Sequence, residues 1–136
     1  MPNKTHALEW IQKAQHDLRG ARILYEAGHY TDTISYVLQQ SLEKLLKSFL
    51  AHNNGPIPKS HNLIELYELL GGEIELEEGQ LRLLAIATTY STKQRYPSPH
   101  KFLPSYEEIH EVLQFAEELF VRVCKILDID PAEVKQ

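Results

Sequence analysis

The sequence predicts an all-α fold, an up-and-down bundle of about five helices, and two observations lead to this prediction. Prolines stand only at positions 2, 56, 58, 97, 99, 104 and 131, which leaves three long stretches without a proline. In these stretches the apolar residues recur at three- and four-residue steps, and none shows sustained two-residue alternation. The length of 136 residues is enough to bury one core, so we expect a single domain over residues 1–136.

The first two predicted helices are both long and follow one another directly in the chain. An apolar stripe from Leu8 to Tyr25 predicts a helix over residues 5–27, and Gly28 is a natural stop. A second stripe predicts a helix from 31 to about 51, ended by a loop with two prolines. Because a tight turn joins these helices, we expect them to be antiparallel.

Two shorter helices are predicted next. Ser60 is the expected cap of a short helix that runs through Leu70 and stops at two glycines, 71–72. A further helix is expected from about 77 to 90, with its apolar residues on one side.

A last helix follows a segment with three prolines. We expect residues 91–104 to be an ordered but non-helical excursion. Ser105 and Glu108 have the spacing of a capping box, and the helix that they open should end before Asp130.

Composition and missing motifs exclude several functions. The net charge of -5 argues against a protein that coats duplex nucleic acid by charge alone. Cys124 is the only cysteine, so no intrachain disulfide can form. No signal peptide and no membrane-length apolar run occurs, and we expect a cytoplasmic protein. The chain also has no glycine-rich phosphate loop and no two histidines three or four residues apart, the spacing of a metal site on a helix. We therefore expect neither a metal nor a cofactor.

The second predicted helix has a polar flank beside its apolar stripe. Gln40, Glu43, Lys44 and Lys47 share this flank because residues three and four apart are neighbours on a helix. One interpretation is a solvated face on which Glu43 and Lys47 form a pair worth about 0.3–0.5 kcal/mol. The other is that Gln40, Glu43 and Lys44 border a functional cleft.

The proline-rich segment contains the only local basic cluster of this acidic chain. Lys93, Arg95, His100 and Lys101 form the cluster, and Tyr96 lies between them. Arginine suits a phosphate through its planar fork of donors, and histidine exchanges protons near neutral pH. Phosphodiester cleavage needs both functions. The alternative is a surface loop in which Arg95 caps the preceding helix.

A set of short motifs, taken in order and spacing, resembles a known family. The motifs are Asp17-Leu18, Leu24-Tyr25-Glu26-Ala27-Gly28-His29-Tyr30, Gln39-Gln40, Glu43-Lys44-Leu45-Leu46-Lys47, His61-Asn62-Leu63 and Arg95-Tyr96-Pro97. Together they resemble the HEPN domain in its small prokaryotic form, over about residues 5–128. The resemblance implies a bundle of about five helices that dimerises through its long helices.

The resemblance also implies an activity. In active relatives an arginine, followed four to six residues later by a histidine, forms a ribonuclease site at the dimer interface without metal. That pattern corresponds to Arg95 and His100, with Lys93, Tyr96 and Lys101 as binding neighbours. Many small members are toxins paired with a minimal nucleotidyltransferase. The sequence therefore predicts a homodimeric, toxin-like ribonuclease that acts on RNA or nucleotides with such a partner.

Two positions keep alternatives open. Tyr96 and Pro97 follow the arginine where active members have a small polar residue. Phe102 stands where the toxin subgroup has a tyrosine that the partner modifies. These positions favour a non-catalytic adaptor that binds the nucleotidyltransferase or a nucleotide through the Arg95 segment. A plain helical interaction module, in which the spacing of Arg95 and His100 is accidental, is the third interpretation.

Overall fold

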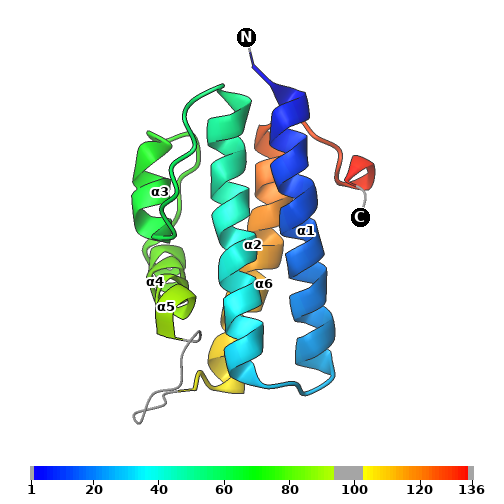
Figure 1. Cartoon of the computed structure of the whole chain (residues 1–136), viewed down its shortest axis with the longest axis vertical. Coiled ribbons are helices and arrows are strands. Elements are labelled where there is room, and N and C mark those ends of the chain that lie inside the picture. Colours follow the sequence, from blue (N-terminus) through cyan, green and yellow to red (C-terminus); the bar gives the residue numbers. More distant parts are fainter. Residues whose placement is uncertain (1, 94–102, 135–136) are drawn as a thin grey trace.

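The computed structural model describes residues 2–93 and 103–134, and this part of the chain is helical without any strand (Figure 1). The elements, in chain order, are α1 (Lys4–Glu26), α2 (Thr31–His52), α3 (Leu63–Leu69), α4 (Glu78–Thr88), α5 (Tyr90–Lys93), α6 (Tyr106–Ile126) and the 3-10 turn η1 (Pro131–Glu133). The all-α prediction is therefore confirmed.

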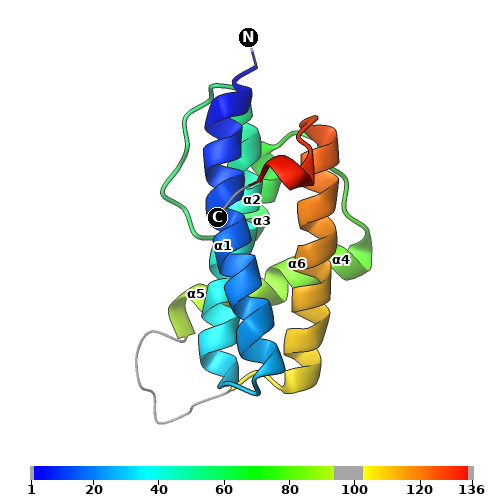
Figure 2. The ribbon, with the colours of Figure 1, turned by 90° about the vertical axis from the view of Figure 1, so that its right-hand side faces the viewer.

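Helix α2 is the centre of the bundle and contacts each of the other five α-helices. Helices α1 and α2 lie side by side and antiparallel, and α6 packs against both (Figure 1). The short helices α3, α4 and α5 cover the remaining side of α2, and Figure 2 shows the bundle from a second direction. One helix thus carries residues that face every other part of the domain.

The core follows the predicted apolar stripes. Every third or fourth residue of α1, from Ala7 to Ala21, is buried against α2 and α6. The largest fully buried side chains come from all the longer elements, among them Ile11, Leu38, Leu42, Leu45, Phe49, Leu66, Leu84 and Ile109. Burying so many large apolar side chains in one cluster is the main stabilising contribution to the fold.

The predicted stop between α1 and α2 is confirmed. Gly28 has a φ of +71°, a left-handed conformation that a glycine adopts without steric cost. The amide of His29 donates to the carbonyl of Leu24 at 2.9 Å, which closes the helix end as the chain turns back.

The cap of α3 differs from the predicted one. The carboxamide oxygen of Asn62 accepts from the amides of Ile64 and Glu65, at 3.0 and 3.2 Å. Ser60 instead accepts from the amide of Asn62 at 3.1 Å and so supports the residue that caps the helix. The physical reason is position, because only Asn62 directly precedes the first helical residue.

The predicted helix over 77–90 is divided. Helix α4 ends at Thr88, and a separate single turn, α5, covers residues 90–93, of which 91–93 were expected to be non-helical. The hydroxyls of Thr89 and Ser91 donate to the carbonyls of Ile86 and Thr88. In a continuous helix these carbonyls would instead accept from backbone amides one turn further on. The rest of the predicted excursion, apart from 103–104, lies outside the described residues.

The Ser105 cap of α6 is confirmed, since its hydroxyl accepts from the amide of Glu108 at 3.1 Å. The other half of the expected capping box differs, because the Glu108 carboxylate accepts from the Tyr90 hydroxyl. None of the described helices is long and apolar enough to cross a membrane.

Candidate functional site

Helix α2 buries an unusual number of polar side chains. Gln39, Glu43 and Lys47 lie one turn apart on one face, and all three are buried. The buried serines of the same helix bond to backbone carbonyls, as Ser41 does to Ala14 at 2.9 Å. A buried polar group is tolerated only when its hydrogen bonds are made. The chemistry available on this face therefore depends on the hydrogen-bond partners of Glu43 and Lys47.

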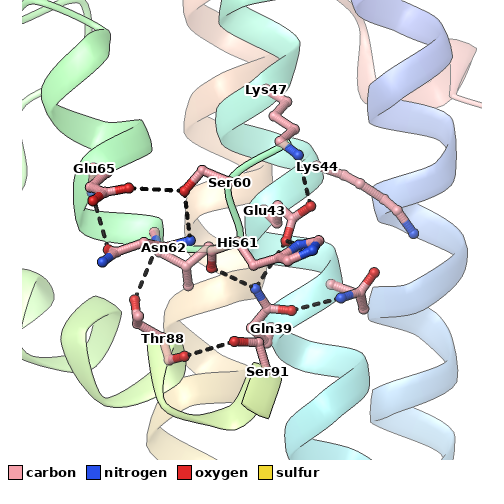
Figure 3. A network of polar contacts seen from close by, with 12 residues as sticks. Gln39, Glu43, Lys44, Lys47, Ser60, His61, Asn62, Glu65, Thr88 and Ser91 are labelled. Carbon is pink, nitrogen blue, oxygen red and sulfur yellow. Dashed lines mark hydrogen bonds and ion pairs between the residues drawn. The ribbon is translucent and has the colours of Figure 1, made fainter. Parts of the chain in front are cut away.

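The carboxylate of Glu43 is the centre of a buried network (Figure 3). Its Oε2 accepts from Nζ of Lys47 at 2.9 Å. Its Oε1 accepts from Nε2 of Gln39 at 3.0 Å and contacts Nδ1 of His61 at 2.9 Å. Three donors from two segments of the chain therefore converge on one carboxylate.

The pKa of Glu43 is lower than the usual value of a glutamate. Burial by itself raises this pKa, and the hydrogen bonds from Lys47, His61 and Gln39 outweigh the burial. The side chain is therefore an ionised, buried carboxylate at neutral pH, and an ionised carboxylate only accepts hydrogen bonds.

The protonation of His61 follows from this partner. Because the Glu43 carboxylate can only accept, Nδ1 of His61 must carry a proton. In the neutral ring the lone pair is then on Nε2. The His61 side chain as a whole is 54% exposed. The carbonyl of His61 accepts from Nε2 of Gln39 at 3.0 Å, so the backbone is held as well as the ring.

Further bonds connect the His61 loop to α4 and α5. The amide of Leu63 donates to the Thr88 hydroxyl at 3.1 Å, and Ser91 donates to the Thr88 carbonyl at the same distance. Ser91 belongs to α5, the turn that leads into the basic segment. The loop with His61 and the start of the basic segment are thus joined through one residue (Figure 3).

The other two predicted residues of the α2 flank have partners of their own. Nζ of Lys44 lies 2.6 Å from Oδ2 of Asp17 in α1, with both side chains about a quarter exposed, 23% and 26%. Nε2 of Gln40 donates to Oε1 of Gln39 at 2.8 Å and so orients the amide that holds His61. Helix α2 therefore brings Gln40 and Glu43 into one network, while Lys44 ties α2 to α1.

The interpretation of this flank as a solvated face is wrong for two of its members. Glu43 and Lys47 are only 7% and 6% exposed. The loop before α3 and the ring of Trp10, whose centroid lies 5.9 Å from Nζ of Lys47, flank the pair. Their ion pair is a buried one, whose energetics differ from those of a surface pair.

The residues of the basic cluster fall mostly outside the described part of the chain. Lys93 is the last residue of α5, and its side chain is not among those described. Arg95, Tyr96, His100 and Lys101 lie outside the described residues.

Three members of the buried network, Gln39, Lys47 and His61, were not predicted as site residues from the sequence. The pattern of the first two was visible, because Gln39, Glu43 and Lys47 recur at four-residue steps beside an apolar stripe. A polar row of this kind at the edge of a core-facing stripe indicates a buried network as well as a solvated flank. The contact with His61 depends on a loop 18 residues away, and no local pattern predicts it.

A second surface feature is a groove between α1 and α6. It is lined by Gln15, Leu18, Arg19, Arg22, Ile23, Glu117, Phe120 and Val121. Arg22 and Glu117 bridge it through two contacts, Nε to Oε2 at 3.0 Å and Nη2 to Oε1 at 2.5 Å. Ile23 and Val121 remain 65% and 56% exposed, so an apolar surface on the two long helices stays uncovered.

Comparisons with known proteins agree on one fold. The HEPN domain family matches residues 7–127. The chain resembles TT1696 from Thermus thermophilus, with a TM-score of 0.75, 24% identity, and coverage of 89% of this chain and 98% of that one. It also resembles ST0689, an archaeal HEPN homologue, with a TM-score of 0.62, 20% identity, and coverage of 90% and 98%. No curated protein matches this sequence.

Proposed function

This chain belongs to the HEPN domain family, and we propose that it is a dimeric, toxin-like ribonuclease that works without metal beside a minimal nucleotidyltransferase. The observation that carries the proposal is the Arg95–His100 pattern, which has four intervening residues in a chain matched by the family over residues 7–127. This spacing is the one that active members of the family use for RNA cleavage.

The two residues have separate roles in the proposed reaction. His100 assists the attack of the ribose 2′-hydroxyl on phosphorus by taking its proton. Arg95 stabilises the charge that develops on the phosphate oxygens. Lys93 and Lys101 add positive charge for the RNA backbone, and Tyr96 offers a ring on which an unpaired base stacks.

Contacts of the described residues support a site beside α2. Helix α5, which leads into the basic segment, packs against α2. Gln39 and Glu43 of the buried network lie on that helix, and His61 lies in the loop before α3. The amide of Leu63, at the end of that loop, donates to the Thr88 hydroxyl, and Ser91 of α5 donates to the Thr88 carbonyl. Of the α2 residues predicted to bind, Glu43 and Gln40 act by holding His61, and Lys44 acts by fixing α1 against α2.

The proposed dimer uses the uncovered apolar surface of α1 and α6. We expect a symmetric interface of at least roughly 1,000 Å² that buries Ile23 and Val121. Val121→Lys would then place a charge in the interface and shift the protein from dimer to monomer in light scattering at micromolar concentration. Leu69→Lys is the matched control, because Leu69 is similarly exposed but lies on α3. A wild-type monomer, or equal effects of the two variants, would contradict the proposed interface.

The ribonuclease function is tested by incubating the purified dimer with RNA in the presence of EDTA. We expect cleavage that leaves a 2′,3′-cyclic phosphate, because the attacking group is the ribose 2′-hydroxyl. Intact RNA after prolonged incubation at every pH between about 5 and 8, the range over which a histidine titrates, would exclude the ribonuclease.

The alternative function is a non-catalytic adaptor, which Tyr96, Pro97 and Phe102 favour over a toxin. Phe102 has no hydroxyl for a partner to modify. An adaptor would bind the nucleotidyltransferase or a nucleotide in calorimetry and leave RNA intact.

A further inference from the structure

His61 differs from every other described histidine in its partner. His6 contacts the exposed Glu9, and His110 contacts the Tyr25 hydroxyl. Only His61, among residues 2–93 and 103–134, has a ring nitrogen on a buried carboxylate, with Nδ1 at 2.9 Å from Oε1 of Glu43. Its Nε2 has no hydrogen-bond partner in this part of the chain, and the side chain is half exposed.

This arrangement is suited to proton transfer. A carboxylate behind Nδ1 fixes the tautomer and the orientation of an imidazole and stabilises its protonated form. Glu43 cannot turn away, because Lys47 and Gln39 hold it from other directions. Gln39 also binds the carbonyl of His61, so both the ring and the backbone are positioned before any ligand arrives.

We propose that His61, held by Glu43, is the general acid that protonates the leaving 5′-oxygen of RNA. The proposal rests on the ribonuclease function proposed above, in which His100 takes the 2′-hydroxyl proton and one proton must still reach the leaving group. Glu43 and Gln39 are positioning residues, since they act through His61 and do not touch the substrate.

The step balances without any further reactant. The 2′-oxygen forms a bond to phosphorus, and the bond from phosphorus to the 5′-oxygen breaks with its electron pair on the 5′-oxygen. The Nε2–H bond of protonated His61 breaks as a new O–H bond forms on that oxygen. The proton of the 2′-hydroxyl is then on His100, which releases it to the solvent, and neutral His61 takes one proton from the solvent, so both residues return to their starting forms for the next turnover.

The test uses a variant that keeps the structural contact and removes the functional atom. In His61→Asn the side-chain amide nitrogen replaces Nδ1 as the donor to Glu43, and no equivalent of Nε2 remains. We expect cleavage of ordinary RNA to fall by about 10²–10⁴-fold, which is the contribution of one acid–base group. His16→Ala is the matched control, because His16 is exposed on α1 and is not a member of the buried network.

A second substrate separates an acid from a residue that only supports the fold. At a bond that the wild-type protein cuts, the leaving 5′-oxygen is replaced by sulfur, which departs without a proton. We expect His61→Asn to cut this bond within about tenfold of the wild-type rate, whereas His100→Ala stays strongly impaired on both substrates, since the 2′-hydroxyl still needs a base.

The outcomes distinguish this inference from the proposed function. Equal losses of His61→Asn on the oxygen and the sulfur substrate, or no loss on either, overturn the role of His61 while the ribonuclease stands. A wild-type protein that cuts neither substrate overturns the ribonuclease and the role of His61 with it.

Discussion

Replacing Arg95 or His100 with alanine is expected to lower RNA cleavage by about 10²–10⁴-fold, because each change removes one electrostatic or one acid–base contributor. The double variant should lose much less than the product of the single losses, since both groups act on one transition state. Single-turnover cleavage of one RNA by the wild-type protein, the two single variants and the double variant measures this.

Folding and binding controls decide how that result is interpreted. The sequence places both residues in a proline-rich segment outside the helical stripes, so thermal melting should be almost unchanged. Arg82→Ala is the matched control for charge, because Arg82 is exposed on α4. If the chain is only a binder, Arg95→Ala weakens RNA affinity and its salt dependence, His100→Ala does little, and the catalytic roles are contradicted.

Among the substitutions proposed here, those that break the buried ion pair of Glu43 and Lys47 on α2 are expected to lower the free energy of unfolding most. Glu43→Leu leaves the Lys47 ammonium buried without an anion, and Lys47→Met leaves the carboxylate with two donors instead of three. Removing one partner of a buried pair costs about 3–5 kcal/mol of the free energy of unfolding. The double variant should lose clearly less than the sum, because no uncompensated charge remains.

Urea unfolding of these variants measures the effect, and Lys44→Gln is the matched control. The pair of Lys44 with Asp17 is partly exposed, so its loss should cost about 1 kcal/mol or less. Losses below about 1 kcal/mol in both Glu43→Leu and Lys47→Met would contradict a buried pair and restore the interpretation as a solvated one.

Acid unfolding provides a second measurement of the same network. The pKa of Glu43 is lowered in the folded protein, so the stability that it contributes is fully present above its unfolded value of 4.5. That contribution is lost as the pH falls through the lower folded pKa. Stability should therefore decrease less steeply below about pH 4.5 in Glu43→Leu than in the wild-type protein.

The all-α class and most helix boundaries could be predicted from local sequence patterns. Proline positions and the three- to four-residue apolar period are local properties, so residues 5–27 and 31–51 were predicted within a few positions of α1 and α2. Gly28 marked the turn because a left-handed conformation favours glycine. Two details could not be predicted from the apolar pattern: Asn62 rather than Ser60 caps α3, and the helix breaks after Thr88. Both depend on which neighbouring side chain bonds a given backbone group, and the apolar pattern contains no information on that.

The role of the polar row of α2, Gln39, Glu43 and Lys47, depends on the packing of distant segments. From the sequence, Glu43 and Lys47 have the spacing of an ordinary surface pair, and nothing local separates a solvated row from a buried one. The loop that precedes α3 covers the row and brings His61 onto Glu43 from 18 residues away. Burial strengthens each charge interaction and makes every missing partner costly, and burial is a property of how distant segments pack.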